Sequence, residues 1–169
     1  GEVRAVYRKI HMFDITGSDG TVHRESAVTT PGRDIVTYDI GDLRIGCTIC
    51  YDLRFPELFQ ELAHRGAKVI VVPASFTLLT GKDHWEPLLR ARAIDTQCYI
   101  LASAQAGRTE DGSRPTYGNS MIVDPWGTVV ARGREGEGVV SGYLDFGYQN
   151  LVRSRIPVAD HHTLLNKTG

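Results

Sequence analysis

The sequence has few cysteines, almost no net charge and no long apolar run, and each of these absences excludes a class of protein. The 169 residues include only three cysteines, which argues against a disulfide-stapled secreted domain and fits a reducing, cytoplasmic setting. The formal net charge of −1 provides no general attraction to nucleic acid or to a membrane surface. No apolar run approaches the roughly 20 residues that a membrane-spanning helix needs. We therefore expect one ordinary globular domain.

Hydrophobic patterning predicts an α/β fold. Apolar residues recur on one face after Pro56, a residue favoured at the first helical position, until Gly66 ends the pattern. A second helix is expected from about Asp83 to Gln97. The early strands alternate with helices and the late strands form hairpins, so we expect a mixed sheet with helices packed on it. The strands are expected near residues 2–7, 35–38, 43–49, 68–72, 99–104, 120–123, 128–131 and 139–144.

The stretch GCTICYDLRFPEL, residues 46–58, holds two cysteines three residues apart. A redox pair of the C-x-x-C type begins a helix, whereas Cys47 and Cys50 end a strand pattern, in which residues three apart point to opposite faces. Zinc needs about four ligands, and neither a second C-x-x-C nor histidines at ligand spacing are present. We therefore expect no metal site, and a redox role rests on this pair alone.

Cys50 has a position that suits a nucleophile. It lies where a strand gives way to the turn before the helix at Pro56, and the carboxyl ends of such strands commonly carry ligand chemistry. The helix N-terminus and nearby cations would favour a thiolate. A buried structural cysteine fits the same position equally well, so the local pattern leaves both interpretations open.

Four segments, in order along the chain, resemble motifs of the nitrilase superfamily, the carbon–nitrogen hydrolases. They are YRKIHMFD (7–14), ICYDLRFPEL (49–58), the segment 74–99 and YGNSMIVDPWGTVVA (117–131). The resemblance is greatest to the Nit-type amidase branch. It implies an αββα sandwich, with two sheets between helix layers, which is often extended by dimerisation. A homodimer or a higher homo-oligomer is therefore expected.

The resemblance also implies a Glu–Lys–Cys catalytic set without metal or organic cofactor. Cys50 matches the nucleophile, Lys9 matches the lysine, and Glu25 matches a second glutamate near the active site. The implied reaction is hydrolysis of a small linear amide, an ω-amide of a dicarboxylate or a deaminated-glutathione-like substrate, to a carboxylate and ammonia through a cysteine thioester. A thiolate makes this hydrolysis a two-step reaction, and Lys9 with the backbone N–H of Tyr51 could stabilise the oxyanion.

Further residues are candidates for substrate binding. Arg54 could hold a substrate carboxylate, although an ion pair between Asp52 and Arg54 that shapes the turn is the interpretation we favour for those two. Phe76 and Thr77 fall where the family lines its substrate pocket, and ordinary loop packing explains them nearly as well. Together with Tyr51, these residues form the predicted substrate-binding set.

The family's general-base glutamate has no counterpart here, because the sequence begins only eight residues before Lys9. We therefore expect residues 1–169 to be the C-terminal portion of a single carbon–nitrogen hydrolase domain, incomplete at its N-terminus and inactive by itself. The alternative is a non-catalytic binding or assembly module with the same fold. A C-x-x-C redox protein is a third class.

Overall fold

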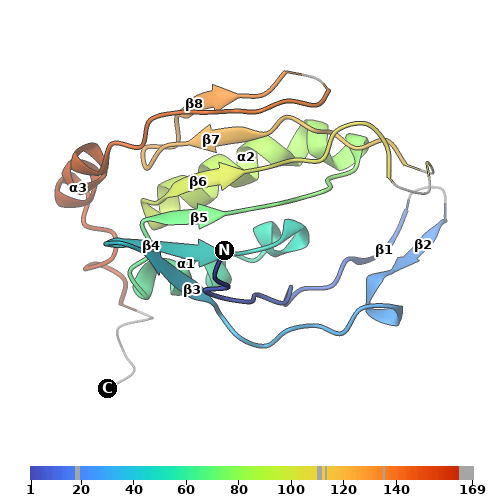
Figure 1. Cartoon of the computed structure of the whole chain (residues 1–169), viewed down its shortest axis with the longest axis horizontal. Helices are drawn as coiled ribbons and strands as arrows, with labels where there is room; N and C mark the ends of the chain where they lie inside the picture. The colour runs from blue at the N-terminus through green and yellow to red at the C-terminus, as the bar shows by residue number, and fades with distance from the viewer. Residues whose placement is uncertain (18–19, 110–111, 113, 135, 164–169) are drawn as a thin grey trace.

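The computed structural model describes residues 1–17, 20–109, 112, 114–134 and 136–163, and this part of the chain forms a six-stranded mixed sheet and a separate two-stranded hairpin (Figure 1). The order in the large sheet is β3-β4-β5-β6-β7-β8, in which β4, β5 and β6 are parallel and the outer pairs are antiparallel. The predicted α/β class with a mixed sheet is confirmed. The elements are β1 (Asp14–Thr16), β2 (Val22–Arg24), β3 (Thr37–Ile40), β4 (Leu43–Cys47), β5 (Val69–Val71), β6 (Tyr99–Ala102), β7 (Met121–Val123), β8 (Val129–Arg132), α1 (Pro56–His64), α2 (Leu78–Thr96), α3 (Phe146–Arg155) and the short 3-10 helices η1 (Glu25–Ala27) and η2 (Cys50–Arg54).

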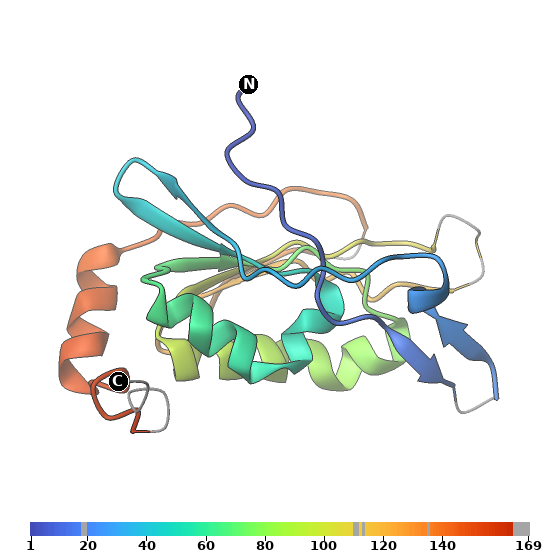
Figure 2. The ribbon, with the colours of Figure 1, turned by 90° about the horizontal axis from the view of Figure 1, so that it is seen from below.

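Helices α1 and α2 cover one face of the sheet (Figure 2). Ile70 and Ile100 on the central parallel strands are fully buried, as are Trp85 and Leu89 on α2. Burial of such side chains from water is the main stabilising term for a layered fold, so this core fixes where the parallel strands end. Among the described helices, none combines the length and the apolar character needed to cross a membrane.

The opposite face of the sheet is also apolar. Ile45, Val69 and Tyr99 are buried there in a second, smaller cluster, and Leu144 and Phe146 pack against it. Figure 2 shows no helix layer over this face in the part of the chain that the structure describes, with α3 at one end. The described residues therefore form one helix layer and one large sheet, which is half of the predicted αββα arrangement.

Several sequence-based element assignments were wrong. Residues 2–7 and 139–144 were expected as strands but have no ladder partner among the described residues; alternating apolar residues favour an extended chain, but a strand also needs a neighbour. Helix α2 begins at Leu78 instead of near Asp83, because Thr77 caps it by accepting a hydrogen bond from the Thr80 N–H, and it continues through Pro87. The hairpin β1–β2 and helix α3 were not predicted.

Gly81 marks a close approach between α2 and the loop before β7. A Cβ atom placed on Gly81 would lie 2.3 Å from Cβ of Tyr117. Alanine in place of a helical glycine ordinarily stabilises a protein by up to about 1 kcal/mol. Here we expect Gly81→Ala to lower the free energy of unfolding by about 1–3 kcal/mol, because overpacking forces the backbones apart. Urea denaturation would measure this, with Lys82→Ala at the exposed neighbouring position as the control; a stabilised Gly81→Ala protein would contradict the expectation.

Candidate active site

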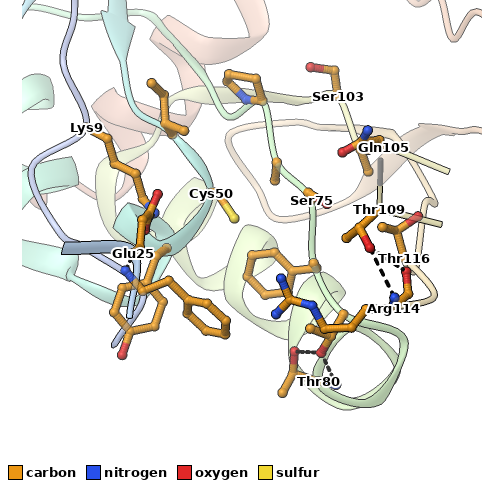
Figure 3. A pocket seen from close by; sticks show the side chains of 18 of the residues that line it. Lys9, Glu25, Cys50, Ser75, Thr80, Ser103, Gln105, Thr109, Arg114 and Thr116 are labelled. Carbon is orange, nitrogen blue, oxygen red and sulfur yellow. Dashed lines mark hydrogen bonds and ion pairs between the residues drawn. The ribbon is translucent and has the colours of Figure 1, made fainter. Parts of the chain in front are cut away.

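A cavity of about 710 Å³ opens at the carboxyl ends of β4, β5 and β6. Residues 49–51, 73–77 and 103–105, which follow these three strands, line one side of it. Lys9 and Glu25 lie on the other side (Figure 3), and Phe13 and His23 also line the cavity. Carboxyl ends of neighbouring parallel strands are a common location for ligand sites, and here they bring together segments that are far apart in the sequence.

Cys50 occupies the turn between β4 and α1 and is held in an unusual backbone conformation. Its φ of 51° lies in the left-handed region, which side chains other than glycine rarely adopt and which is common at functional sites. Its N–H donates to the carbonyl of Pro73 at 2.9 Å, which ties the turn to the end of β5. Figure 3 shows its sulfur pointing into the cavity, between Lys9 and Glu25 on one side and Ser75 on the other.

The surroundings that this chain provides disfavour the thiolate form of Cys50. Burial raises its pKa above that of a free thiol. Hydrogen bonds from the backbone N–H groups of Ser75 and Tyr51, and the charge of Lys9, act in the opposite direction without cancelling the effect, and the charge of Glu25 adds to it. A nucleophilic Cys50 therefore needs a base to take its proton.

This pKa predicts how the reactivity of Cys50 depends on pH. Only the thiolate is alkylated, and a raised pKa leaves little thiolate near neutrality. We expect the rate of Cys50 alkylation by iodoacetamide to rise by about tenfold per pH unit from pH ~7 upward and to level off above the range of free cysteine, pKa ~8.5. Peptide mass spectrometry after timed alkylation would follow it, with free glutathione as the reference thiol. A plateau in the alkylation rate below pH ~8 would mean that nearby cations lower the pKa of Cys50 by more than burial raises it.

Lys9 and Glu25 form an ion pair that faces the cavity. The Lys9 side chain is only 9% exposed, and its ammonium lies 5.9 Å from the ring centroid of Tyr51. The Glu25 carboxylate also accepts the N–H of Phe13 at 2.6 Å. A lysine with so little solvent contact and a fixed partner has one main orientation, and Figure 3 shows it beside Cys50.

All four residues of the predicted substrate-binding set line the same cavity. The Arg54 guanidinium lies 5.9 Å from the Tyr51 ring centroid and 5.5 Å from the Phe76 ring centroid, and it is 3.3 Å from Nδ1 of His84. Phe76 is buried against Trp85. The Thr77 hydroxyl caps α2, so this side chain also has a structural role.

The expected ion pair between Asp52 and Arg54 is not formed. The Asp52 carboxylate is fully buried and accepts hydrogen bonds from Tyr7, His11 and Ile49. Arg54 instead points to the cavity, where it stacks on aromatic rings. The prediction failed because it considered only neighbours along the turn, whereas the partners of Asp52 come mainly from the segment around Lys9.

Several polar residues of the cavity were missed by the sequence analysis. Ser75, Ser103 and Gln105 follow β5 and β6, and their positions after neighbouring strands were the available signal. Thr109 and Arg114 come from the long loop between β6 and β7, and no local pattern marks them. Figure 3 shows Arg114 on the side of the cavity opposite Lys9 and Glu25.

The two cysteines of the C-x-x-C pair have different environments. Cys50 lines the cavity, whereas Cys47 is not among the lining residues and is half-buried at the end of β4. Both are free thiols. In the described part of the chain, no group of three or more histidine, cysteine, aspartate or glutamate side chains is arranged to hold a metal ion.

Comparison with known proteins identifies the family. The model of the carbon–nitrogen hydrolase family matches residues 1–153. The deaminated glutathione amidase of Bos taurus is 46% identical over 95% of this chain and 49% of its own length. The C. elegans NitFhit protein superposes with a TM-score of 0.88 at 42% identity, over 95% of this chain and 39% of that protein. Saccharomyces cerevisiae Nit3, a member of branch 10 of the nitrilase superfamily, superposes with a TM-score of 0.83 at 35% identity, over 94% of this chain and 54% of that protein.

The chain thus spans about half the length of the relatives that it matches. The match nevertheless includes nearly all of its residues and all of the elements that surround the cavity. The chain belongs to the carbon–nitrogen hydrolase family, and within it to the Nit-type branch of the nitrilase superfamily.

Proposed function

We propose that the protein is an amidase and that this chain carries its nucleophile. The observation that supports this most directly is the convergence of Lys9, Glu25 and Cys50 on one cavity, although they come from three separate segments. A cysteine held at a positive φ between a partly buried ion pair and backbone N–H groups is suited to acyl transfer.

In the proposed reaction, Sγ of Cys50 attacks the carbonyl carbon of the amide while a carboxylate takes the thiol proton. The ammonium of Lys9 and the N–H of Tyr51 stabilise the tetrahedral oxyanion. The carboxylic acid then returns the proton to the leaving nitrogen, the C–N bond breaks, and a thioester remains on Cys50. Water, deprotonated by the same carboxylate, attacks the thioester and releases the carboxylate product and the thiol. A primary amide releases ammonia in this scheme, and a substituted amide releases the corresponding amine.

The base of this scheme is not assigned to Glu25. Its carboxylate is engaged by Lys9 and by the N–H of Phe13, which suits a residue that orients Lys9. The relatives are about twice as long as this chain. We propose that residues 1–169 are the C-terminal portion of a single carbon–nitrogen hydrolase domain and that the remaining part supplies the base and covers the apolar face of the sheet around Ile45 and Val69.

A small anionic amide is the proposed substrate class, of the deaminated-glutathione type. The cavity carries the cations Lys9, Arg54 and Arg114, and Glu25 is its only acidic lining residue among those described. A site with this excess of positive charge favours substrates that contain carboxylates. The relatives named deaminated glutathione amidase are 40–46% identical to this chain, which supports the same choice.

We further propose a homo-oligomer, at least a dimer, in the cytoplasm. The edge strands β3 and β8 carry the exposed apolar residues Ile40 and Val130, and exposed sheet edges favour pairing with another chain. The free thiols fit a reducing compartment. Light scattering coupled to size-exclusion chromatography would give the mass of the assembly, and a monomeric mass would contradict the first part of the proposal.

The test of the proposed function uses the intact protein with two probes, deaminated glutathione and a primary ω-amide of a dicarboxylic acid. Mass spectrometry would identify the carboxylate product, and an acid quench would trap an acyl group on the peptide that contains Cys50. We expect product with at least one probe and an acyl adduct at Cys50. Binding without product or adduct would favour the non-catalytic module with the same fold.

A further inference from the structure

The carboxylate of Asp52 joins two parts of the candidate site. It is fully buried and accepts four hydrogen bonds: from the Tyr7 hydroxyl at 2.7 Å, from the His11 N–H at 3.1 Å, from Nδ1 of His11 at 2.8 Å and from the Ile49 N–H at 2.9 Å. Asp52 follows Cys50 by two residues, and Ile49 immediately precedes it. Tyr7 and His11 lie two residues on either side of Lys9.

The segment that carries Lys9 depends on these contacts because it has no regular secondary structure. Residues 1–13 belong to no helix or strand, so no ladder fixes their position. The carbonyl of Lys9 accepts one backbone hydrogen bond, from the N–H of Gly32 at 2.8 Å. The His11 ring also stacks on Phe55, with ring centroids 3.6 Å apart. Asp52 and Phe55 thus hold the chain at His11, two residues after Lys9, against the turn that carries Cys50.

Four hydrogen bonds to one buried carboxylate are strong and directional. Such bonds to an ionised acceptor are about twice as strong as neutral ones, and a buried carboxylate that loses a donor is costly. Tyr7 remains a donor throughout the neutral range, since burial and the bond to Asp52 raise its pKa well above the usual tyrosine value. The arrangement therefore has one low-energy geometry, and that geometry sets the separation of the Lys9 and Cys50 segments.

We propose that Asp52 is a positioning residue for the Cys50 chemistry, which through Tyr7 and His11 fixes the ammonium of Lys9 relative to the Cys50 sulfur. Asp52 does not line the cavity and contacts no reacting atom. Its effect is transmitted along the backbone, from residue 52 to residue 50 on one side and from residues 7 and 11 to residue 9 on the other. The inference rests on the proposed amidase function for its kinetic consequence, but the geometric part stands without it.

The experiment compares two tyrosine variants of the intact protein that each lose a single hydroxyl with part-buried hydrogen bonds. Tyr7→Phe removes the donor to Asp52. Tyr99→Phe removes a hydroxyl that bonds the backbone of Asp145, at the opposite end of the sheet, and serves as the matched control. Asp52→Asn is the third variant, since it keeps the shape of the side chain and puts a donor where an acceptor is needed. Melting temperature, kcat, KM and the rate of Cys50 alkylation by iodoacetamide are measured for each.

We expect Tyr7→Phe and Tyr99→Phe to lose similar thermal stability, because each deletes one hydroxyl group with part-buried hydrogen bonds, one to the Asp52 carboxylate in Tyr7 and two to the Asp145 backbone in Tyr99. We expect kcat to fall by about tenfold in Tyr7→Phe and by about 10²-fold in Asp52→Asn, with KM within about twofold, because a small misplacement of a reacting group costs rate rather than binding. Cys50 alkylation should change in both variants, since the charge of Lys9 acts on the thiol. Tyr99→Phe should keep both kcat and the alkylation rate.

Equal kcat values and equal alkylation rates in Tyr7→Phe and Tyr99→Phe would overturn the proposal and leave Asp52 with a purely structural role. The tyrosine pair decides this even when Asp52→Asn does not fold. Alkylation separates this proposal from the proposed function, because it needs no substrate. A protein without amidase activity whose Cys50 alkylation still changes in Tyr7→Phe, and not in Tyr99→Phe, would refute the reaction and support the positioning role.

Discussion

Replacing Cys50 with alanine should abolish amide turnover, with kcat lower by about 10³-fold or more, while the fold remains nearly unchanged. The loss is large because no other group can form the thioester, and removing a covalent nucleophile removes the whole two-step pathway. The stability should change by only about 1 kcal/mol, since Cys50 packs only partly against the core and its sulfur points into a cavity. The φ of 51° is equally unfavourable for alanine, so the variant keeps the same backbone cost.

Cys47→Ala is the matched control for this experiment, because it removes a thiol three residues earlier, at the end of β4. The amidase scheme predicts that Cys47→Ala keeps most of the wild-type kcat, whereas a C-x-x-C redox protein would lose its function with either cysteine. Substantial turnover in Cys50→Ala would refute the assignment of the nucleophile. Steady-state kinetics with the substrate identified from the two probes, together with urea denaturation of both variants, provides the measurements.

The parts of the fold that depend on local pattern could be predicted from the sequence. The helix that begins at Pro56 and the strands on either side of it were expected, because the apolar period and the proline act over short distances. The start of α2 was misplaced, because the only signal for it is the hydroxyl of Thr77, which caps the helix. Pro87 lies inside the helix, although proline normally interrupts helices. Strand pairing of residues 2–7 was expected from alternation alone, although alternation does not supply a partner.

In the candidate site, too, residues in local motifs could be predicted, whereas contacts between distant segments could not. Cys50, Lys9 and Glu25 were assigned by resemblance, because motifs preserve residue types and order along the chain. The contacts of Asp52 could not be read from the sequence: Tyr7 and His11 are 45 and 41 residues away, and only the folded chain brings them together. Arg114 was missed for a related reason, because its loop has no periodicity and its place in the cavity depends on how β6 and β7 are packed.

Lys9→Ala should lower kcat by about 10² or more and change KM little, since the ammonium is proposed to stabilise charge that exists only in the transition state. The structure adds a second consequence, because Lys9 is the cationic partner of Glu25. Without it, the Glu25 charge acts on Cys50 unopposed and raises the thiol pKa further. Alkylation of Cys50 at pH ~7 should therefore be slower in Lys9→Ala than in the wild-type protein.

Glu25→Gln separates the two roles of the ion pair. If Glu25 acts by orienting Lys9, the double variant Lys9→Ala with Glu25→Gln should have nearly the same kcat as Lys9→Ala alone, because residues that act as one unit are not additive. If Glu25 has an independent role on the substrate or on water, the two losses should multiply. Lys82→Ala, an exposed lysine on α2, is the control for removing a positive charge. A normal kcat in Lys9→Ala would reduce Lys9 to a structural partner of Glu25 and leave the N–H of Tyr51 as the oxyanion donor in this chain.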